Sequence, residues 1–353
     1  MPWIGKISAL VLTYNRKELL LQCLQAILAQ VEPADEVIVL DNGSTDNTCE
    51  YLEESGFLED GRIVLYRRPE NTGPSAGVDS LFRLGNEHGS EWIWYMDDDT
   101  IADPDALKEL KDAYAENFSH PEEVGFLKSV VVSADGRPNG LPEVDLRAAP
   151  GQASSWADRL GSGLVKVRCG TFVSILVPRS TLMRVGDIYP DFVSYGEDTD
   201  FTLRTTEVLP AYLVGKSKVT HLSPDVGRFR SLEKKDPISI DLGRLYYRNN
   251  LYFRWHYYSF GRTALYVCKC LYEALRALGA KSYPLRRMSA IMRGLFSGLL
   301  FAMRHKAGAW HRSPDLPPPP LELRRKPVRD RGGSVPQNGS ATAEFVDFSP
   351  PRA

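Results

Sequence analysis

The hydrophobic pattern of the first 120 residues alternates between short apolar runs and longer stretches with helical spacing. Four apolar runs have the length of β-strands: residues 7–12, 36–40, 62–66 and 92–96. Residues 16–30 repeat apolar side chains every three or four positions, and Pro104 opens a further helical stretch over 105–117. Strand and helix thus alternate four times, which favours an α/β fold with an open, mostly parallel central sheet flanked by helices.

Acidic residues follow two of these apolar runs. Asp41 ends the second run, and Asp97, Asp98 and Asp99 follow the fourth. Because ligands bind at the carboxyl ends of strands in such sheets, we expect a binding site there. Three adjacent carboxylates repel one another, and a divalent cation of the Mn²⁺ or Mg²⁺ type would relieve that repulsion and could also hold a diphosphate. The alternative is a solvated loop that caps a helix.

The pattern changes after residue 125. Three further strand-like segments are expected to complete the sheet: residues 130–132, 164–167 and 171–177. Aromatic-rich helical stretches begin at residue 242, and a basic amphipathic stretch covers 262–311. The Pro/Gly/Ser-rich end is typical of disorder. We therefore expect three regions: an α/β domain over 1–225, a basic helical extension over 226–313, and a disordered tail over 314–353.

Composition narrows the class of protein. The five cysteines are odd in number and form no Cys-x-x-Cys pair, which argues against a disulfide framework or a zinc finger and favours a reducing, cytoplasmic setting. No signal peptide is visible. The most apolar late segment, 294–303, is shorter than the roughly 20 residues that span a bilayer, so we expect no transmembrane helix.

Charge is distributed unevenly along the chain. Residues 226–312 hold 17 Lys and Arg against 4 Asp and Glu, whereas residues 1–225 carry a net charge of about −16. An acidic half suits metal capture. A basic half suits phosphate-bearing ligands or an anionic membrane surface.

A second acidic segment stands before a helical stretch. Glu197, Asp198 and Asp200 lie within four residues, and helix capping accounts for one of them. A carboxylate in this position is suited to general-base catalysis, and Asp198 is our candidate. His221, which ends a strand-like run, could complete a metal shell, although a lone histidine is often structural.

Residues 67–77 combine two arginines with glycines just before a predicted helix. Glycines allow close backbone approach, and a helix N-terminus attracts anions, so this loop could bind phosphate. An ordinary strand-to-helix turn with solvated arginines is the alternative.

Five motifs, taken in order, resemble those of family 2 glycosyltransferases with the GT-A fold. They are VLTYNR at 11–16, VLDNGSTD at 39–46, ENTG at 70–73, DDD at 97–99 and GEDTD at 196–200. The resemblance covers roughly residues 6–225. It implies an inverting, metal-dependent transfer of a sugar from a nucleotide diphosphate to an acceptor hydroxyl.

The resemblance also implies roles for individual residues. Thr13 and Asp41 would hold the base of the nucleotide, and Asp97 or Asp98 would contact its ribose. Asp99 and His221 would bind the metal. The full set at the nucleotide sugar is Thr13, Tyr14, Arg16, Asp41, Arg68, Asn71, Gly73, Asp97 and Asp98. Asp198 would be the catalytic base, and Glu197 and Asp200 would contact the acceptor.

Within the family, segments 92–96, 169–172 and 246–250 are most similar to bacterial galactofuranosyl- and rhamnosyltransferases of cell-wall or surface-glycan assembly. This implies a UDP- or dTDP-sugar donor and a glycan or polyprenyl-linked glycan acceptor. Pro74 and Ser75 stand where galactofuranosyltransferases have a more glycine-rich stretch, which leaves the donor sugar open.

The basic stretch 269–312 is interleaved with leucines and could rest on an anionic leaflet, which would place the protein peripherally on the inner face of the membrane. The alternative is a pair of packed helices with a solvated basic face. An oligomer is left open.

Two other functions are compatible with the pattern. A catalytically silent nucleotide-sugar-binding or scaffold protein would not need the carboxylates that are intact at both sites. A nucleotidyltransferase would carry a Gly-rich, basic signature where Thr13, Tyr14, Asn15 and Arg16 stand. No nucleic-acid-reading motif is present, so we expect no nucleic-acid partner.

Overall fold

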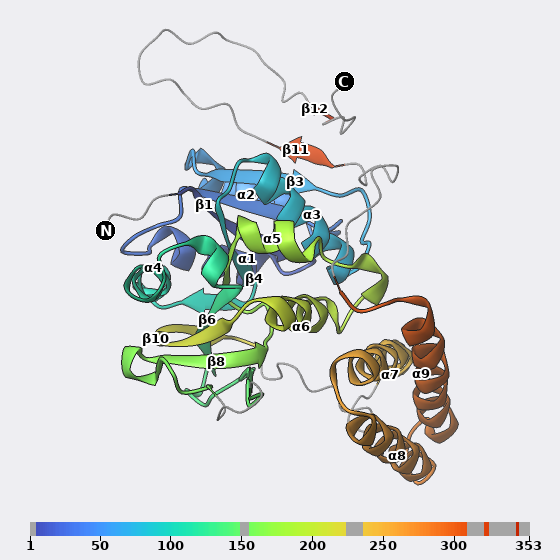
Figure 1. Cartoon of the computed structure of the whole chain (residues 1–353). Helices are drawn as coiled ribbons and strands as arrows, with labels where there is room; N and C mark the ends of the chain where they lie inside the picture. Colours follow the sequence, from blue (N-terminus) through green and yellow to red (C-terminus); the bar gives the residue numbers. More distant parts are fainter. Residues whose placement is uncertain (1–4, 149–154, 224–235, 309–320, 325–343, 346–353) are drawn as a thin grey trace, which may run out of the picture.

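The computed structural model describes residues 5–148, 155–223, 236–308, 321–324 and 344–345 (Figure 1). Its first half alternates strands and helices: β1 (Ile7–Thr13), α1 (Lys17–Leu28), β2 (Glu36–Asp41), α2 (Thr48–Glu54), β3 (Ile63–Arg67), α3 (Pro74–Glu87), β4 (Trp92–Asp97) and, after a short β5 (Thr100–Ala102), α4 (Ala106–Asn117). β1 pairs in parallel with β2 and β4, and β2 pairs in parallel with β3. The four predicted strands and their parallel arrangement are confirmed.

The second half extends the same sheet with mixed pairings. Its elements are β6 (Phe126–Ser133), β7 (Glu143–Val144), β8 (Leu164–Cys169), β9 (Ile175–Pro178), α5 (Arg179–Val185), α6 (Glu197–Val208) and β10 (Ala211–His221), with short 3₁₀ turns at Phe57–Glu59, Pro121–Glu123, Leu160–Ser162 and Pro190–Phe192. β9 lies antiparallel between β4 and β6, and β10 runs parallel to β6 but antiparallel to β8 and β5. The predicted segment 171–177 becomes a strand only from Ile175, because Ser174 has a positive φ of 51° that breaks the extended backbone.

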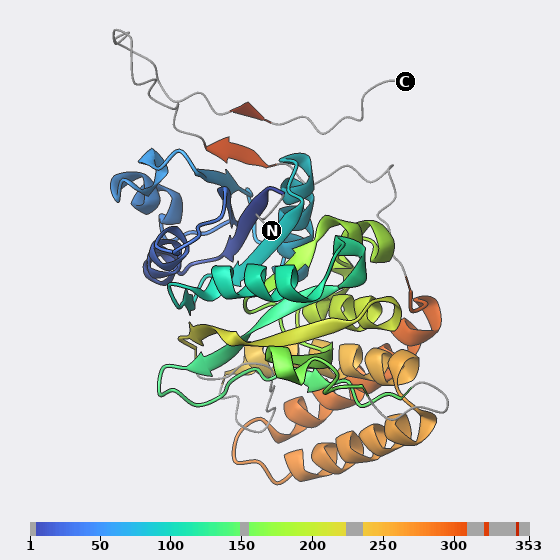
Figure 2. The same cartoon turned by 60° about the vertical axis from the view of Figure 1, so that its left-hand side comes forward.

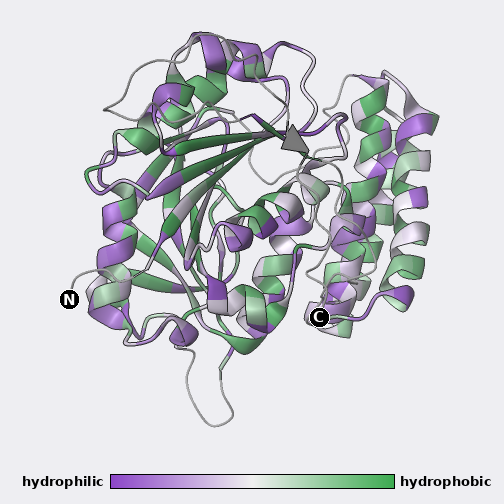
Figure 3. Cartoon of the chain, turned by 90° about the horizontal axis from the view of Figure 1, so that it is seen from above, coloured by the Kyte–Doolittle hydropathy of each residue, from purple (hydrophilic) through white to green (hydrophobic). Residues whose placement is uncertain are grey.

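The sheet is covered by helices on both faces, and its strands are mainly hydrophobic (Figures 2 and 3). Successive residues of β1 point to opposite faces. Val11 packs in the cluster that contains side chains of α1, α2 and α4, whereas Leu10 packs with side chains of α3, α5 and α6. Burial of each such side chain stabilises the fold by about 1.5–3 kcal/mol. The predicted α/β class with flanking helices is therefore confirmed.

Three long helices follow the sheet: α7 (Pro237–Tyr257), α8 (Phe260–Ala277) and α9 (Pro284–Arg304). They lie beside α6 (Figure 1). α9 approaches α7 closely at two glycines: a Cβ on Gly294 would lie 2.6 Å from the Cβ of Tyr247, and one on Gly298 would lie 2.9 Å from the carbonyl oxygen of Arg248. The predicted C-terminal helices are present. The division at residue 225 stays a prediction, since residues 224–235 lie outside the described part.

An aromatic cluster joins these helices to the α/β part of the chain. Tyr189, Phe192 and Leu203 come from the segment around α6, and they pack against side chains of α7 and α9 that include Tyr252 and Phe301. Within the described ranges no helix is both long and apolar enough to cross a membrane.

A short strand near the C-terminus returns to the sheet. β11 (Glu322–Arg324) pairs antiparallel with β3, and β12 (Glu344–Phe345) pairs with β11. These residues fall within the tail that was predicted to be disordered. Leu321, just before β11, is also described and is buried, and the remainder of that tail lies outside the described residues.

Candidate active site

The carboxyl ends of three parallel strands bring the N-terminal acidic residues to one edge of the sheet. In the strand register Thr13 lies opposite Asp41, and Leu12 lies opposite Asp97. The pairing therefore gathers Thr13, Asp41 and the aspartates after β4 at the edge where the pattern of strands predicted a site.

Asp97, Asp99 and His221 form a cluster at this edge. Each offers one ligand atom, and these atoms all lie within 4.8 Å of one another. β10 delivers the histidine, because His221 pairs with Thr100 in the antiparallel β5. His221 Nε2 lies 3.0 Å from Asp99 Oδ1 and 4.0 Å from Asp97 Oδ2. The structure thus adds Asp97 to the predicted pair of metal ligands.

The tautomer of His221 suits a ligand. Its Nδ1 lies 3.0 Å from the carbonyl oxygen of Ser223, which can only accept, so Nδ1 is the donor. When the ring is neutral, the Nε2 lone pair would then be available to a metal ion beside the two carboxylates. Apart from the histidine contact, the buried Asp99 Oδ1 accepts no hydrogen bond from any described residue. A hard divalent cation fits these carboxylate oxygens and this imidazole nitrogen.

The charges in this cluster are strongly coupled. Burial and, after it, the nearby charge of Asp99 raise the pKa of Asp97 to about 6. For Asp99, burial acts in the same direction, but hydrogen bonds from His221 and Ser223 outweigh it and bring the pKa down to about 2. Burial lowers the pKa of His221, and the Asp99 contacts overcome this, so the net shift is upward. Such perturbed groups are frequent at functional sites.

Asp98 faces a different set of partners. Its carboxylate accepts hydrogen bonds from Thr13 Oγ1 at 2.8 Å and from the Arg16 guanidinium at 3.2 Å, and the same guanidinium reaches Asp99 at 2.8 Å. Burial raises the pKa of Asp98 to about 7, although Arg16 and Thr13 pull it down. Tyr14, between these two partners in sequence, is exposed. The structure therefore brings Thr13, Arg16 and Asp98 together, and their contacts with a nucleotide sugar stay predictions.

Asp41 lies fully buried at the end of β2. One oxygen accepts a hydrogen bond from the backbone N–H of Ser44 at 2.8 Å, and the other lies 3.2 Å from the Cys49 sulfur and 3.6 Å from Arg67 Nε. These contacts fix the loop that follows the strand.

The predicted phosphate loop is held from beneath. Arg68 is buried, and its guanidinium bonds Thr72, Ser80 and the carbonyl oxygen of Ala76 at 2.9 Å. Its donors therefore shape the loop, which is a correction to its prediction as a direct ligand-binding residue. Asn71 is exposed and accepts from the N–H of Gly73 at 2.8 Å.

The second acidic segment opens α6. Asp198 accepts from the backbone N–H of Thr199 at 2.6 Å, and Glu197 accepts from the Ser75 hydroxyl at 2.9 Å. Burial raises the pKa of Glu197 to about 7, with the neighbouring Asp198 charge in support, and burial likewise raises the pKa of Asp198. The Asp198 charge also raises the pKa of Asp97, so the two carboxylates lie near enough to interact.

Asp200 lies elsewhere. It forms a buried ion pair with Arg204 at 2.7 Å and accepts from the Tyr257 hydroxyl at 3.4 Å. Residues two apart on a helix point to opposite sides, so Asp200 faces α7 when Asp198 faces the site. Its prediction as an acceptor contact is corrected to a structural ion pair.

Lys128 is a residue that sequence reasoning missed. It is fully buried in β6, and its ammonium donates to the carbonyl oxygens of Thr171 and Val173 at 2.8 and 2.7 Å and to the Thr171 hydroxyl at 3.2 Å. Burial lowers its pKa to about 8, while the charges of Asp97 and Asp198 act in the opposite direction. A single lysine inside the apolar run 126–132 was the available signal.

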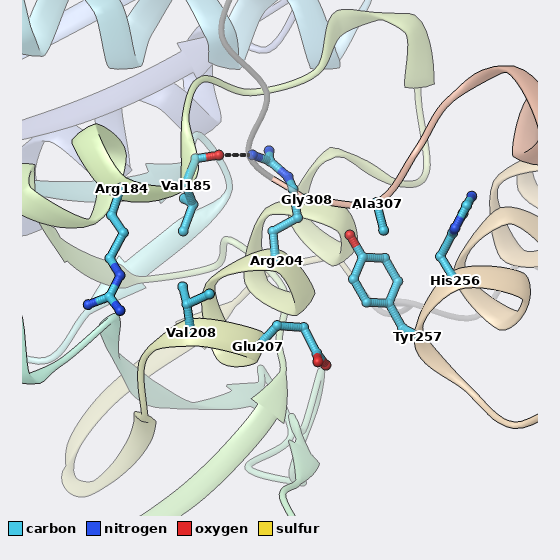
Figure 4. Close-up of a pocket in the computed structure, with 9 residues that line it drawn as sticks. All are labelled: Arg184, Val185, Arg204, Glu207, Val208, His256, Tyr257, Ala307 and Gly308. Atoms are coloured by element: carbon cyan, nitrogen blue, oxygen red, sulfur yellow. Dashed lines mark hydrogen bonds between the residues drawn. The ribbon is translucent and has the colours of Figure 1, made fainter.

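A hollow of about 230 Å³ lies away from these carboxylates (Figure 4). It is bordered by α5, by the second half of α6, by the end of α7 and by residues 307–308 after α9, and Arg204 and Tyr257 line it. Because both side chains serve the Asp200 ion pair, we interpret the hollow as a junction between elements.

Comparisons with known proteins agree with this arrangement. Residues 8–120 match Glycosyl transferase family 2. The chain is 28% identical over 110 residues to the undecaprenyl-phosphate 4-deoxy-4-formamido-L-arabinose transferase of Proteus mirabilis, covering 30% of this chain and 33% of that protein. It is 27% identical over 148 residues to the poly(ribitol-phosphate) beta-glucosyltransferase of Bacillus spizizenii, covering 40% and 22%. The matches thus span a third or less of these relatives' lengths.

One solved structure supports the fold over nearly the whole chain. The chain resembles the crystal structure of GalNAc-T7 with UDP, GalNAc and Mn²⁺. The superposition covers 99% of this chain and 68% of the GalNAc-T7 chain, with 11% sequence identity and a TM-score of 0.53. At this identity the likeness speaks for the fold alone. In sequence, residues 8–120 match glycosyl transferase family 2, which agrees with the predicted resemblance over the first third of the chain.

Proposed function

We propose that this protein is an inverting glycosyltransferase that moves a sugar from a nucleoside diphosphate to an acceptor hydroxyl. The observation that carries the proposal is the proximity of two acidic groups of different origin. One is the Asp97, Asp99 and His221 cluster, and the other is Asp198 at the start of α6. The family match over residues 8–120 includes the two aspartates of the first group.

In this proposal, Thr13, Asp41 and Asp97 to Asp99 form what we name the donor edge. Asp97, Asp99 and His221 would hold Mn²⁺ or Mg²⁺, which supplies positive charge for the diphosphate. Thr13 and Arg16 fix Asp98, and the buried Asp41 fixes the turn after β2. Tyr14, Asn71 and Gly73 lie on the neighbouring turns and stay predicted donor contacts.

Asp198 acts on the acceptor. As the acceptor oxygen forms its bond to the anomeric carbon, the bond from that carbon to the diphosphate oxygen breaks on the opposite face, and the hydroxyl proton passes to the Asp198 carboxylate. The Thr199 N–H orients this carboxylate, and Lys128 adds a nearby positive charge that favours its ionised form. Glu197, held by Ser75, stays a predicted acceptor contact.

The finer predictions concern substrates. A UDP- or dTDP-linked galactofuranose or rhamnose remains the favoured donor, and a glycan or polyprenyl-linked glycan of the cell envelope remains the favoured acceptor. The names of the two bacterial relatives are compatible with envelope glycans but specify other sugars.

We also propose peripheral contact with an anionic membrane from the cytoplasmic side. On α8, Arg262, Lys269 and Arg276 repeat every seven residues and so form one exposed row, next to exposed apolar side chains that include Tyr272 and Leu275. Leu295 and Phe301, which also lie in the stretch 269–312 that was predicted to rest on a membrane, are instead buried between helices.

A panel of UDP-, GDP- and dTDP-sugars, read by thermal shift with Mn²⁺ or Mg²⁺, tests the function. A ligand that binds the native state raises the unfolding temperature, and the shift should need the metal. With this sugar nucleotide as donor, the protein should release the nucleoside diphosphate when bacterial membranes are added as a source of acceptor. Binding without turnover would favour the silent binding or scaffold function, and pyrophosphate release would favour a nucleotidyltransferase.

A further inference from the structure

The segment that leads into Asp198 has an unfavourable backbone. We name residues 190–198 the base loop. Val193 has φ 64° and ψ −53°, and the N–H of Ser194 bonds the carbonyl oxygen of Phe192 at 2.6 Å, so Val193 is the centre of a γ-turn of the rare, positive-φ form. Tyr195 follows with φ 63°. A β-branched and an aromatic residue rarely adopt such angles, and they persist only where the surroundings hold them.

The donors that hold this loop come from α7, more than 50 residues later in the chain. Asn249 is fully buried, and its amide nitrogen donates to the carbonyl oxygens of Ser194 at 2.8 Å, Phe192 at 3.2 Å and Tyr195 at 3.4 Å. Arg248 donates to the carbonyl oxygens of Asp191 at 2.7 Å and Phe192 at 2.9 Å. Four consecutive or near-consecutive carbonyl groups of the loop thus depend on two adjacent side chains.

The two side chains also fix one another. Arg248 Nε donates to Asn249 Oδ1 at 2.8 Å, so the amide oxygen is occupied and the amide nitrogen is directed to the loop. The loop lies directly against α7 at Gly196, where a Cβ would stand 3.0 Å from Asn249 Nδ2 and 3.1 Å from Phe253. Phe192, which precedes Val193, is fully buried in the aromatic cluster and so anchors the loop at this point.

On its opposite side, the base loop contacts α3, which lies next to the donor edge. The carbonyl oxygen of Val193 accepts from the N–H of Ser75 at 3.4 Å, and Glu197 accepts from the Ser75 hydroxyl. The base loop is therefore held between the first turn of α3 and the middle of α7. A shift of α7 would move Asp198 relative to the donor edge.

We propose that Arg248 and Asn249 are positioning residues that hold the strained base loop and thereby place Asp198 for catalysis. This inference rests on the proposed function of Asp198 as the base. It makes α7 part of the active site, so the C-terminal helices serve the reaction as well as any surface they dock on.

The test compares Asn249→Asp with Asn250→Asp. Both remove one amide nitrogen from the same helix, but Asn250 donates only to Tyr246 in its own helix, at 3.0 Å. In Asn249→Asp, a carboxylate faces the loop carbonyls. We expect hydrogen exchange of the backbone amides of 192–198 to speed up at least tenfold, while the amides of β4 exchange as in the wild-type protein. Asn250→Asp should change neither.

The transfer reaction supplies the second readout, with the donor that the nucleotide-sugar panel selects. A displacement of about 1 Å at a reacting group costs about 100-fold in rate, so kcat of Asn249→Asp should fall by about that factor while the donor KM stays unchanged. Combined with Asp198→Asn, it should cause no further loss, because the loop then has no base to place. Arg248→Lys, a milder change, should give an intermediate exchange rate.

Unchanged exchange of 192–198 in Asn249→Asp and Arg248→Lys overturns the positioning role, whatever the base is. Additive losses in the double variant overturn the link to Asp198. Normal turnover of the single variant Asp198→Asn rejects Asp198 as the base. Hydrogen exchange of residues 192–198 then still tests whether Arg248 and Asn249 hold the loop.

Discussion

The donor edge and the base loop place their carboxylates in different ways. At the donor edge, Asp41 and Asp97 end parallel strands whose pairing is local, so a strand followed by an acid is sufficient to put the acid there. In the base loop, Asp198 stands after two residues with positive φ that are held by side chains of α7. The comparison shows that one wall of the site comes from regular secondary structure and the other from long-range contacts.

The largest effect should come from Asp198→Asn. The amide keeps the shape and cannot accept the proton, so transfer should fall by about 10²–10⁴-fold, the range for general-base groups. Thermal shift with the selected donor and Mn²⁺ should be unchanged, because the donor edge is intact. Discontinuous measurement of nucleoside diphosphate release gives the rate.

Asp200→Asn is the matched comparison, since it is the same change two residues along the same helix. Its ion pair with Arg204 is buried, and loss of one partner from such a pair costs about 3–5 kcal/mol of stability. Urea unfolding should show this loss for Asp200→Asn and little change for Asp198→Asn. An equal loss of stability in both variants would contradict the assignment of a structural role to Asp200 and a catalytic role to Asp198.

At the donor edge, Asp99→Asn should weaken Mn²⁺ binding by at least about 100-fold, because it removes a ligand and not only a supporting group. Electron paramagnetic resonance of free Mn²⁺ during a titration measures the affinity. Asp105→Asn, an exposed residue nearby in sequence, should bind Mn²⁺ as the wild-type protein does. Equal Mn²⁺ affinities of the wild-type protein, Asp99→Asn and Asp105→Asn would show that the metal does not bind at this cluster.

Glu197, which accepts from the Ser75 hydroxyl of α3, should make stability depend on pH. Its pKa is raised to about 7, so the folded protein holds this proton more tightly than the unfolded chain. Stability should therefore fall as pH rises from about 4.5 to about 7. Glu197→Gln cannot ionise, and its urea-unfolding profile should be flatter by about 2 kcal/mol between pH 5 and pH 7.5. The exposed Glu122→Gln is the control, and a profile unchanged in Glu197→Gln contradicts the prediction.

The donor edge could be predicted from sequence almost completely, because apolar runs that end in acids encode both strand and site. The base loop could be predicted only as a motif. Nothing near Asp198 in sequence indicates that Asn249 holds its loop, and Lys128 resembles any strand residue until β9 and the segment before it cover it. Arg68 and Asp200 show the converse, since a charged residue in or beside a predicted site motif can hold the structure through hydrogen bonds or an ion pair.

The smallest effect concerns α8, which belongs to neither wall. A basic residue near an anionic leaflet contributes about 1 kcal/mol, so Lys269→Gln should weaken binding to vesicles of phosphatidylglycerol and phosphatidylcholine by about fivefold. Transfer to a soluble acceptor should not change, because Lys269 lies on the exposed row of α8. Lys216→Gln, an exposed lysine of β10, is the matched control. Co-sedimentation in rising salt measures the difference, and equal binding of both variants assigns the basic row to solvent. In that case α8 would serve the site only through its packing beneath α7, whose Arg248 and Asn249 hold the base loop.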